Sequence, residues 1–220
     1  MDLKTIFIAL LLALTMHSFS QRTFSEGTIQ FDISVQTGKP DPQLADMFDG
    51  AQASIQLRGG LSRSELVSAL GSTVTIFDHR AGTGVVLREF GPQKLLIRMD
   101  KDDWTDKNRR YQGIRFIFSK DTKTIAGYPC VRAEAVMPDS SRFMVWFTRQ
   151  LVAENASFDP QFSLLPGTAL EYESTVGGIR VKYAAVNVSF DPVPINRFEV
   201  PKSGYREMNY AESQPRKSGN

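Results

Sequence analysis

The sequence contains very few of the residues that most often carry enzymatic or metal chemistry. Its 220 residues include one cysteine and two histidines. Structural zinc sites take about four cysteine or histidine ligands, and a serine or cysteine nucleophile ordinarily needs a histidine base. His17 lies in a segment that we expect to be removed, which leaves His79. The sequence therefore predicts a protein that is not an enzyme, with no catalytic residues, no metal ligands and no cofactor.

The chain also lacks a strong excess of charge. Its formal net charge is +2, and residues 202–220 account for all of it, with four basic and two acidic side chains. The rest of the chain is neutral, so it has no broad basic surface for nucleic acid. The 41% hydrophobic and 23% charged residues are ordinary for a globular domain. They exclude collagen-like, coiled-coil and largely disordered chains.

The longest apolar run, residues 6–16, lies close to the N-terminus. Ser18 and Ser20 supply small side chains before a cleavage point at Gln21, which is the layout of a secretory signal peptide. A membrane helix needs about 20 apolar residues, so this run is short for a span, and no second long run follows. We expect residues 1–20 to be a signal peptide and the protein to be exported to the periplasm, the outer membrane or the extracellular space. No transmembrane span is expected after cleavage.

Residues 21–208 show no internal repeat and no interdomain linker, so we expect a single domain. Its cysteine, Cys130, must be buried, reactive or paired with another chain. The small apolar neighbours Val131, Ala133 and Ala135 favour burial of an inert thiol. Residues 209–220 are polar and nearly free of apolar side chains, which predicts a disordered tail.

Alternation of apolar and polar side chains, the signature of a half-buried strand, recurs along the domain. It is clearest at Ile29, Phe31, Ile33 and Val35. The other predicted strands are residues 53–57, 73–78, 84–90, 94–99, 114–119, 131–137, 142–148, 168–173, 179–190 and 197–200. Short links with turn residues join most of them, which favours an antiparallel meander. The sequence thus predicts a mainly β fold, a curved antiparallel sheet or half-barrel of roughly ten or eleven strands.

Two strands depart from simple alternation. At Ala184 and Ala185 the apolar side chains change face, which predicts a β-bulge and a bend. Residues 142–148 are apolar on both faces, because Met144 and Trp146 lie opposite three other apolar side chains. Such a strand must be covered on both faces. A helix, a loop or a ligand is therefore expected over the second face.

Helical candidates are few, and we expect one or two short helices to cover one face of the sheet. Residues 42–48 carry apolar side chains at near-helical spacing, with Asp41 as a start signal and Gly50 as a stop signal. Residues 101–111 form a second, more polar candidate. Residues 62–70 fit either a strand or a helix with a capping box.

Two polar features each allow a chemical and a plain interpretation. Four aspartates between residues 100 and 106 suggest a calcium loop. However, Trp104, Thr105 and Tyr111 stand where an EF-hand needs a small oxygen ligand, a glycine and a glutamate, so we favour a charged helix or loop. His79 lies in a polar turn, and the sequence has no G-x-S-x-G nucleophile motif. We expect an exposed turn histidine and not a catalytic base.

The remaining signal is apolar and aromatic, and a plain hydrophobic core accounts for most of it. A bent sheet with more apolar side chains than one face needs can also hold an apolar ligand between the sheet and a helix. For that alternative the expected lining is Met47, Phe48, Trp104, Phe116, Phe118, Met144 and Trp146.

The second half of the chain contains a series of short motifs. They are Ile125-Ala126-Gly127-Tyr128 with Cys130, Val145-Trp146-Phe147-Thr148, Leu165-Pro166-Gly167 followed by Leu170-Glu171-Tyr172, and Phe198-Glu199-Val200-Pro201. In these motifs the chain resembles a bacterial envelope family of unknown function that is related to the GLPGLI-type proteins. The Gly-Leu-Pro-Gly-Leu-Ile core of that type is only partly kept.

The resemblance implies a shape similar to the outer-membrane lipoprotein carrier, in which a bent antiparallel sheet and a helical lid enclose acyl chains. It brings no catalytic residues. It favours a strand for residues 62–70, and Gly127 fits a turn with positive φ. Two expectations follow. The protein binds a lipid or lipoprotein acyl chain in a curved sheet, or it is a structural or interaction module of the envelope that binds a partner protein and no small ligand.

Overall fold

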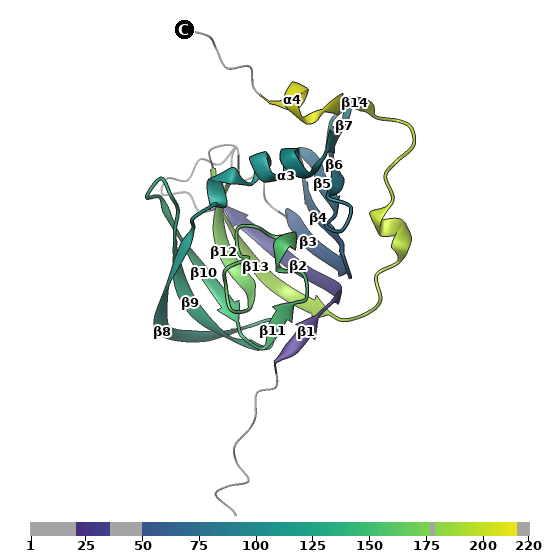
Figure 1. Cartoon of the computed structure of the whole chain (residues 1–220). Coiled ribbons are helices and arrows are strands. Elements are labelled where there is room, and N and C mark those ends of the chain that lie inside the picture. Colours follow the sequence, from purple (N-terminus) through teal and green to yellow (C-terminus); the bar gives the residue numbers. More distant parts are fainter. Residues whose placement is uncertain (1–20, 36–49, 177–178, 215–220) are drawn as a thin grey trace, which may run out of the picture.

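The computed structural model describes residues 21–35, 50–176 and 179–214 (Figure 1). Three features predicted from the sequence lie outside these ranges. They are the predicted signal peptide, the helix candidate at residues 42–48 with Met47 and Phe48, and the end of the chain from residue 215.

A curved, unclosed sheet of twelve strands forms the body of the described chain (Figure 1). The strand order is β14-β7-β6-β5-β4-β3-β2-β13-β12-β10-β9-β8, and only the pair β14 and β7 is parallel. The mainly β half-barrel predicted from the sequence is confirmed. The bounds are β2 Glu26–Val35, β3 Gln52–Arg58, β4 Leu61–Ser68, β5 Gly71–Asp78, β6 Thr83–Phe90, β7 Gln93–Met99, β8 Arg115–Ile125, β9 Tyr128–Val136, β10 Arg142–Thr148, β12 Thr168–Val176, β13 Ile179–Ser189 and β14 Arg206–Asn209.

Short turns join the consecutive strands from β3 to β7 and from β8 to β10, as the meander prediction requires. Between β8 and β9 the turn consists of Ala126 and Gly127, whose φ angles are 47° and 83°. Positive φ at both positions gives the hairpin turn that matches the twist of the flanking strands. The residues predicted to be either strand or helix form β4, and the register between β13 and β2 shifts between Ala185 and Asn187, which confirms the predicted bulge. A separate pair of short parallel strands, β1 (Arg22–Phe24) and β11 (Leu151–Ala153), lies beside the sheet.

The acidic stretch at residues 100–106 forms helix α3 (Lys101–Lys107), followed by the 3-10 turn η1 (Arg109–Tyr111). The Asp100 carboxylate accepts hydrogen bonds from the backbone N–H groups of Asp102 and Asp103, both at 2.9 Å. Asp103 in turn accepts from the N–H of Asp100 at 3.1 Å. These aspartates therefore satisfy the free N–H groups of the first helical turn. The helix lies over the concave side of the sheet (Figure 1).

The opposite face of β4–β7 is covered by the segment after β13, which contains the 3-10 turn η3 (Ile195–Phe198). Val193 and Phe198 are buried there against Val74, Leu87 and Leu96. The predicted strand at residues 197–200 is wrong. Prolines at positions 192, 194 and 201 remove backbone donors around this segment, so it packs through its side chains.

The C-terminal segment is ordered further than the sequence suggests. The predicted tail begins at Asn209, but this residue ends β14 and caps α4 (Tyr210–Ser213). Met208 and Tyr210 pack against Phe77, Val86, Ile97 and Met99. These two apolar side chains thus hold the otherwise polar C-terminal segment on β7. Within residues 21–35, 50–176 and 179–214, no helix has the length and apolar character needed to cross a membrane.

Phe198→Ala should lower the free energy of unfolding by about 3 kcal/mol, because it removes a buried ring from a packed cluster. Ile195→Ala in the same turn should change it by less than about 0.5 kcal/mol, since Ile195 is 53% exposed. Urea denaturation followed by circular dichroism measures both. Equal losses for the two variants would contradict this account of the covered face.

Candidate functional site

A cavity of about 390 Å³ lies between the concave face of the sheet, the α3–η1 segment and the loop that contains η2 (Ala156–Phe158). Ligand cavities of proteins usually measure about 300–1,000 Å³. Apolar and aromatic side chains of the sheet form part of the floor, namely Phe31, Ala53, Ile55, Leu66, Tyr172 and Tyr183. Hydroxyl side chains of the sheet form the rest, namely Ser62, Ser64, Thr73, Thr75 and Ser174. The cap residues Trp104, Lys107, Arg110 and Tyr111 and the loop residues Phe158, Asp159 and Gln161 line the other side of this open cavity.

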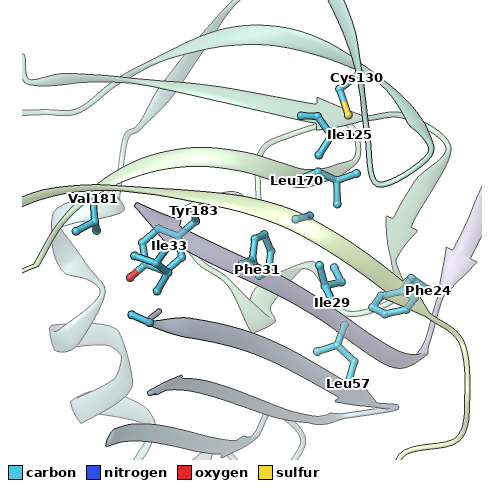
Figure 2. Close-up of a cluster of buried hydrophobic side chains, with 12 residues drawn as sticks. Phe24, Ile29, Phe31, Ile33, Leu57, Ile125, Cys130, Leu170, Val181 and Tyr183 are labelled. Atoms are coloured by element: carbon cyan, nitrogen blue, oxygen red, sulfur yellow. The ribbon is translucent and has the colours of Figure 1, made fainter. Parts of the chain in front are cut away.

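Three aromatic rings from three strands make up the centre of the floor. Tyr172 and Tyr183 are directly paired across β12 and β13, and their rings stack with centroids 4.8 Å apart. The edge of Phe31 meets these rings at 5.8 Å and 6.5 Å. Figure 2 shows Phe31, Ile33 and Tyr183 within the apolar cluster that continues to Leu57. Side chains on one face of neighbouring strands meet in this way because the pleat alternates with period two.

The two tyrosine hydroxyls of the floor are available to a ligand. Neither the Tyr172 nor the Tyr183 hydroxyl forms a hydrogen bond with another described residue. Burial raises the pKa of Tyr172 well above its usual value and that of Tyr183 to about 12. Both groups therefore stay protonated at neutral pH and can donate as well as accept.

The cap is fixed to the sheet by aromatic stacking at one end of α3. The Trp104 ring lies 4.1 Å from the ring of Phe77 on β5 and 5.7 Å from that of His79. A helix with an apolar face would pack against the sheet along its whole length. Helix α3 has no such face, since none of its residues is buried. The helix thus rests on the sheet through Trp104, and the space beside this contact stays open as the cavity.

Charged groups gather where the cap meets the loop. The Asp159 side chain accepts a hydrogen bond from the Gln161 backbone N–H at 3.1 Å. Burial raises the pKa of Asp159 to about 6, although this hydrogen bond and the positive charge of Lys107 both act to lower it. Loss of water lowers the pKa of Lys107, and Asp159 opposes that shift. Both groups line the cavity, Asp159 partly buried and Lys107 exposed.

His79 differs from the exposed turn histidine that we expected, because its ring is half-buried and meets the rings of Phe77 and Trp104 edge-on. Its Nε2 lies 2.9 Å from Ser62 Oγ, and its Nδ1 lies 3.3 Å from Ser157 Oγ. Ser157 donates its hydroxyl proton to Asn155 at 2.5 Å, so Nδ1–H is the donor to Ser157. Nε2 is then the acceptor from Ser62, and burial lowers the pKa of the imidazole.

The pair of Ser62 and His79 places a hydroxyl beside a base, as nucleophilic catalysis requires. Ser62, however, lies inside β4, which is hydrogen-bonded to β3 on one side and β5 on the other. The backbone N–H groups beside Ser62 are therefore used in the sheet and cannot stabilise an oxyanion. We interpret the pair as a structural hydrogen bond.

Only one of the described residues predicted to line an apolar site lies at this cavity, and that residue is Trp104. Phe116 packs into a separate cluster with Val145 and Phe162, and Phe118 is 47% exposed beside Phe147. Both belong to the concave face but to the edge strand β8, away from the cavity.

Met144 and Trp146 lie on the other face of the sheet from the cavity. Their neighbour Val145 pairs with Tyr172, which lines the cavity, and adjacent residues of a strand point to opposite faces. The Lys123 ammonium lies 4.4 Å from the centre of the Trp146 ring and 2.8 Å from Glu171. Arg132 lies 3.8 Å from the sulfur of Met144. The cover predicted for the second face of β10 is therefore provided by charged side chains of neighbouring strands.

The floor residues Phe31, Tyr172 and Tyr183 and the loop residue Asp159 were not among the site residues predicted from the sequence. Alternation along β2 did place Phe31 on the apolar face. Which strands are neighbours, and in what register, is not visible from alternation, so the meeting of the three rings was not foreseen. Asp159 lies in an irregular loop and carries no periodic signal.

The thiol of Cys130 is fully buried, as predicted, and donates to the Tyr128 carbonyl at 3.4 Å. Burial raises its pKa to about 11. In the part of the chain that the structure describes, no three or more His, Cys, Asp or Glu side chains are grouped to hold a metal ion.

Asp159→Asn should remove a pH dependence of stability. The folded-state pKa of about 6 exceeds the ordinary value of 3.8, so the folded protein binds this proton more tightly and Asp159 costs stability as the pH rises from 4 to 6. The variant should unfold with the same free energy as the wild type near pH 4 and exceed it by about 2–3 kcal/mol at pH 7. Parallel urea titrations at several pH values measure the difference. A constant difference across this range would contradict the assignment.

Cys130 should react very slowly with a thiol reagent at pH 8. With a pKa of about 11, only about a thousandth of the thiol is ionised, and the thiolate is the reacting form. Absorbance assays in buffer and in denaturant compare the folded with the unfolded chain. Rapid labelling of the folded protein would show that the thiol is accessible and not inert.

Comparison with known proteins gives no family assignment, since no family model and no curated protein matches the chain. Solved structures with partial similarity include PNGF-II, with 12% identity and a TM-score of 0.45 over 84% of this chain and 32% of that chain. MucB has 10% identity and a TM-score of 0.42 over 81% and 58% of the two chains. A beta-barrel-like protein of the domain of unknown function DUF1849 from Brucella abortus has 6% identity and a TM-score of 0.32 over 77% and 99%. This chain spans about a third of the PNGF-II chain. With TM-scores below 0.5, these similarities indicate no function for this chain, and the resemblance to the GLPGLI-type family stays a prediction.

Proposed function

We propose that this protein is an exported binding protein without enzymatic activity, which holds a lipid, an acyl chain or another apolar ligand in the cavity under α3. The observation that carries the proposal is the aromatic floor of Phe31, Tyr172 and Tyr183 beneath a cap that touches the sheet through Trp104. Apolar walls with a few well-placed polar groups are typical of small-molecule sites.

The size of the cavity supports binding over plain core packing. The cavity opens to solvent, and its volume of about 390 Å³ falls within the range of ligand sites. It lies next to stacked tyrosines with two unused hydroxyls. The strands β2, β3, β12 and β13 around it are fully paired, so a ligand would meet a preformed floor.

Export is proposed from the N-terminal segment and is compatible with the cysteine chemistry. The apolar run at residues 6–16 and the small residues Ser18 and Ser20 suit a signal peptide. A single buried thiol forms no wrong disulfides in an oxidising compartment. The resemblance to the GLPGLI-type envelope family supports the same location.

A second candidate is an interaction module without a small ligand, and the edge strand β8 favours it. Ile117 and Phe118 on β8 are 55% and 47% exposed. Both β8 and β14 are edge strands in the described sheet, but β14 has four residues and β8 has eleven. An open edge with apolar side chains is a site where another protein can pair.

Ala53→Phe should abolish ligand binding, because the added ring enters the cavity from its floor. Gln52→Phe places the same ring on the exposed face of the same strand and is the matched control. Native mass spectrometry of the full chain, purified from the envelope fraction of the organism that makes it, should show bound lipid with the wild type and the Gln52→Phe variant. It should show none with Ala53→Phe, while circular dichroism confirms that the sheet is intact.

Three results would count against the proposal. Wild-type protein free of lipid, and unable to take up lipid added to it, would contradict ligand binding. If the same preparation recovered a partner protein that is lost on Phe118→Ser, the interaction module would be the better account. Equal lipid on all three proteins would show that the ligand lies elsewhere than in this cavity.

A further inference from the structure

Three basic side chains meet at one end of the cavity without ionic partners. Lys107 and Arg110 on the cap line the cavity directly. Arg88 on β6 is paired with Thr73, another lining residue, and its charge acts on Lys107. None of the three lies within 4 Å of a carboxylate of a described residue, and Arg110 bonds only to the Tyr111 hydroxyl.

A single carboxylate of the described chain faces this group, that of Asp159. Even when Asp159 carries its negative charge, the three positive charges leave this group with a net charge of +2. Arg63 and Glu65 also border the cavity, but Glu65 pairs with both Arg63 and Arg197, each at 3.1 Å, so their side chains lie with η3 on the outer face of the sheet. The end of the cavity beside α3 is therefore positive, in a chain whose body is neutral overall.

Among the described residues, unpaired basic side chains also occur elsewhere on the sheet, as at Arg115, Lys120 and Arg180, but these do not line this cavity. Several others are paired. Lys123 and Lys182 share Glu171, Arg132 contacts Asp121, and Arg142 contacts Glu134. Arg88, Lys107 and Arg110 are exposed to solvent, so an anion can reach them. A cluster left without counter-charges beside a cavity is what recognition of an anion requires, because charge-assisted hydrogen bonds from Lys and Arg then form on binding.

The positive end and the aromatic floor belong to the same cavity. The basic groups come from α3, η1 and β6, whereas the apolar floor comes from β2, β3, β12 and β13. We infer that the ligand is a single-chain amphiphile with an anionic head group. Its alkyl chain lies on Phe31, Tyr172 and Tyr183, and its head group pairs with Lys107 and Arg110. This inference rests on the proposed function and adds the chemical class of the ligand.

Lipid-free full-length protein, titrated by isothermal calorimetry, tests the head group separately from the chain. Dodecanoate and monododecanoylglycerol carry the same alkyl chain, but only the first has a charged head. Dodecanoate should bind at least about tenfold more tightly, since hydrogen bonds to charged groups are the stronger ones. Acetate, which has the head group without the chain, should not displace dodecanoate at equal concentration.

Lys107→Gln and Arg110→Gln should each weaken dodecanoate binding about tenfold and change monododecanoylglycerol binding less than about twofold. Arg109→Gln is the matched control. Arg109 is adjacent in the chain but pairs with Asp106 at 3.2 Å and does not line the cavity. It should bind both ligands as the wild type does.

Each outcome separates the two proposals. If both ligands bind equally well and the two variants bind dodecanoate normally, the anionic head group is wrong and the apolar site stands. If acetate displaces dodecanoate at equal concentration, the protein recognises a small anion and not an amphiphile. If neither alkyl ligand binds, both the inference and the proposed function fail.

Discussion

A sheet of twelve strands has two faces, and the way each face is covered determines the rest of this structure. The outer face of β4–β7 is closed by the segment around η3, which buries Val193 and Phe198. The concave face is covered differently. Helix α3 buries no residue fully and meets the sheet where Trp104 stacks on Phe77. Incomplete cover on the concave face leaves the cavity open.

The chemistry of the cavity follows from this geometry. The curved strands bring Phe31, Tyr172 and Tyr183 together as a floor, because each lies on the face that the curvature encloses. Helix α3 contributes polar residues to the cavity, among them Lys107 in its last turn. Partial loss of water then shifts the pKa values of Asp159 and Lys107 in opposite directions. A space with an apolar floor and a charged end suits an amphiphilic molecule.

The sequence predicts the local structure of this protein better than its site. Alternation located most strands and the bulge after Ala185, because burial of one face imposes a period of two. It failed at residues 197–200, where prolines prevent sheet pairing and the apolar residues serve packing alone. Alternation also placed Met144 and Trp146 on the other face of the strand from Val145. It could not show which of the two faces lines the cavity. The floor forms through the register of strands that are distant in the sequence, and Asp159 is placed by an irregular loop. Neither feature produces a local pattern in the sequence.

The most direct test of this account is an experimental structure of the lipid-free protein soaked with dodecanoate. The account predicts an alkyl chain over the stacked rings of Tyr172 and Tyr183 and a carboxylate within hydrogen-bond distance of Lys107 or Arg110. A cavity filled by the protein's own side chains, or a ligand bound only on the outer face beside Trp146, would contradict it.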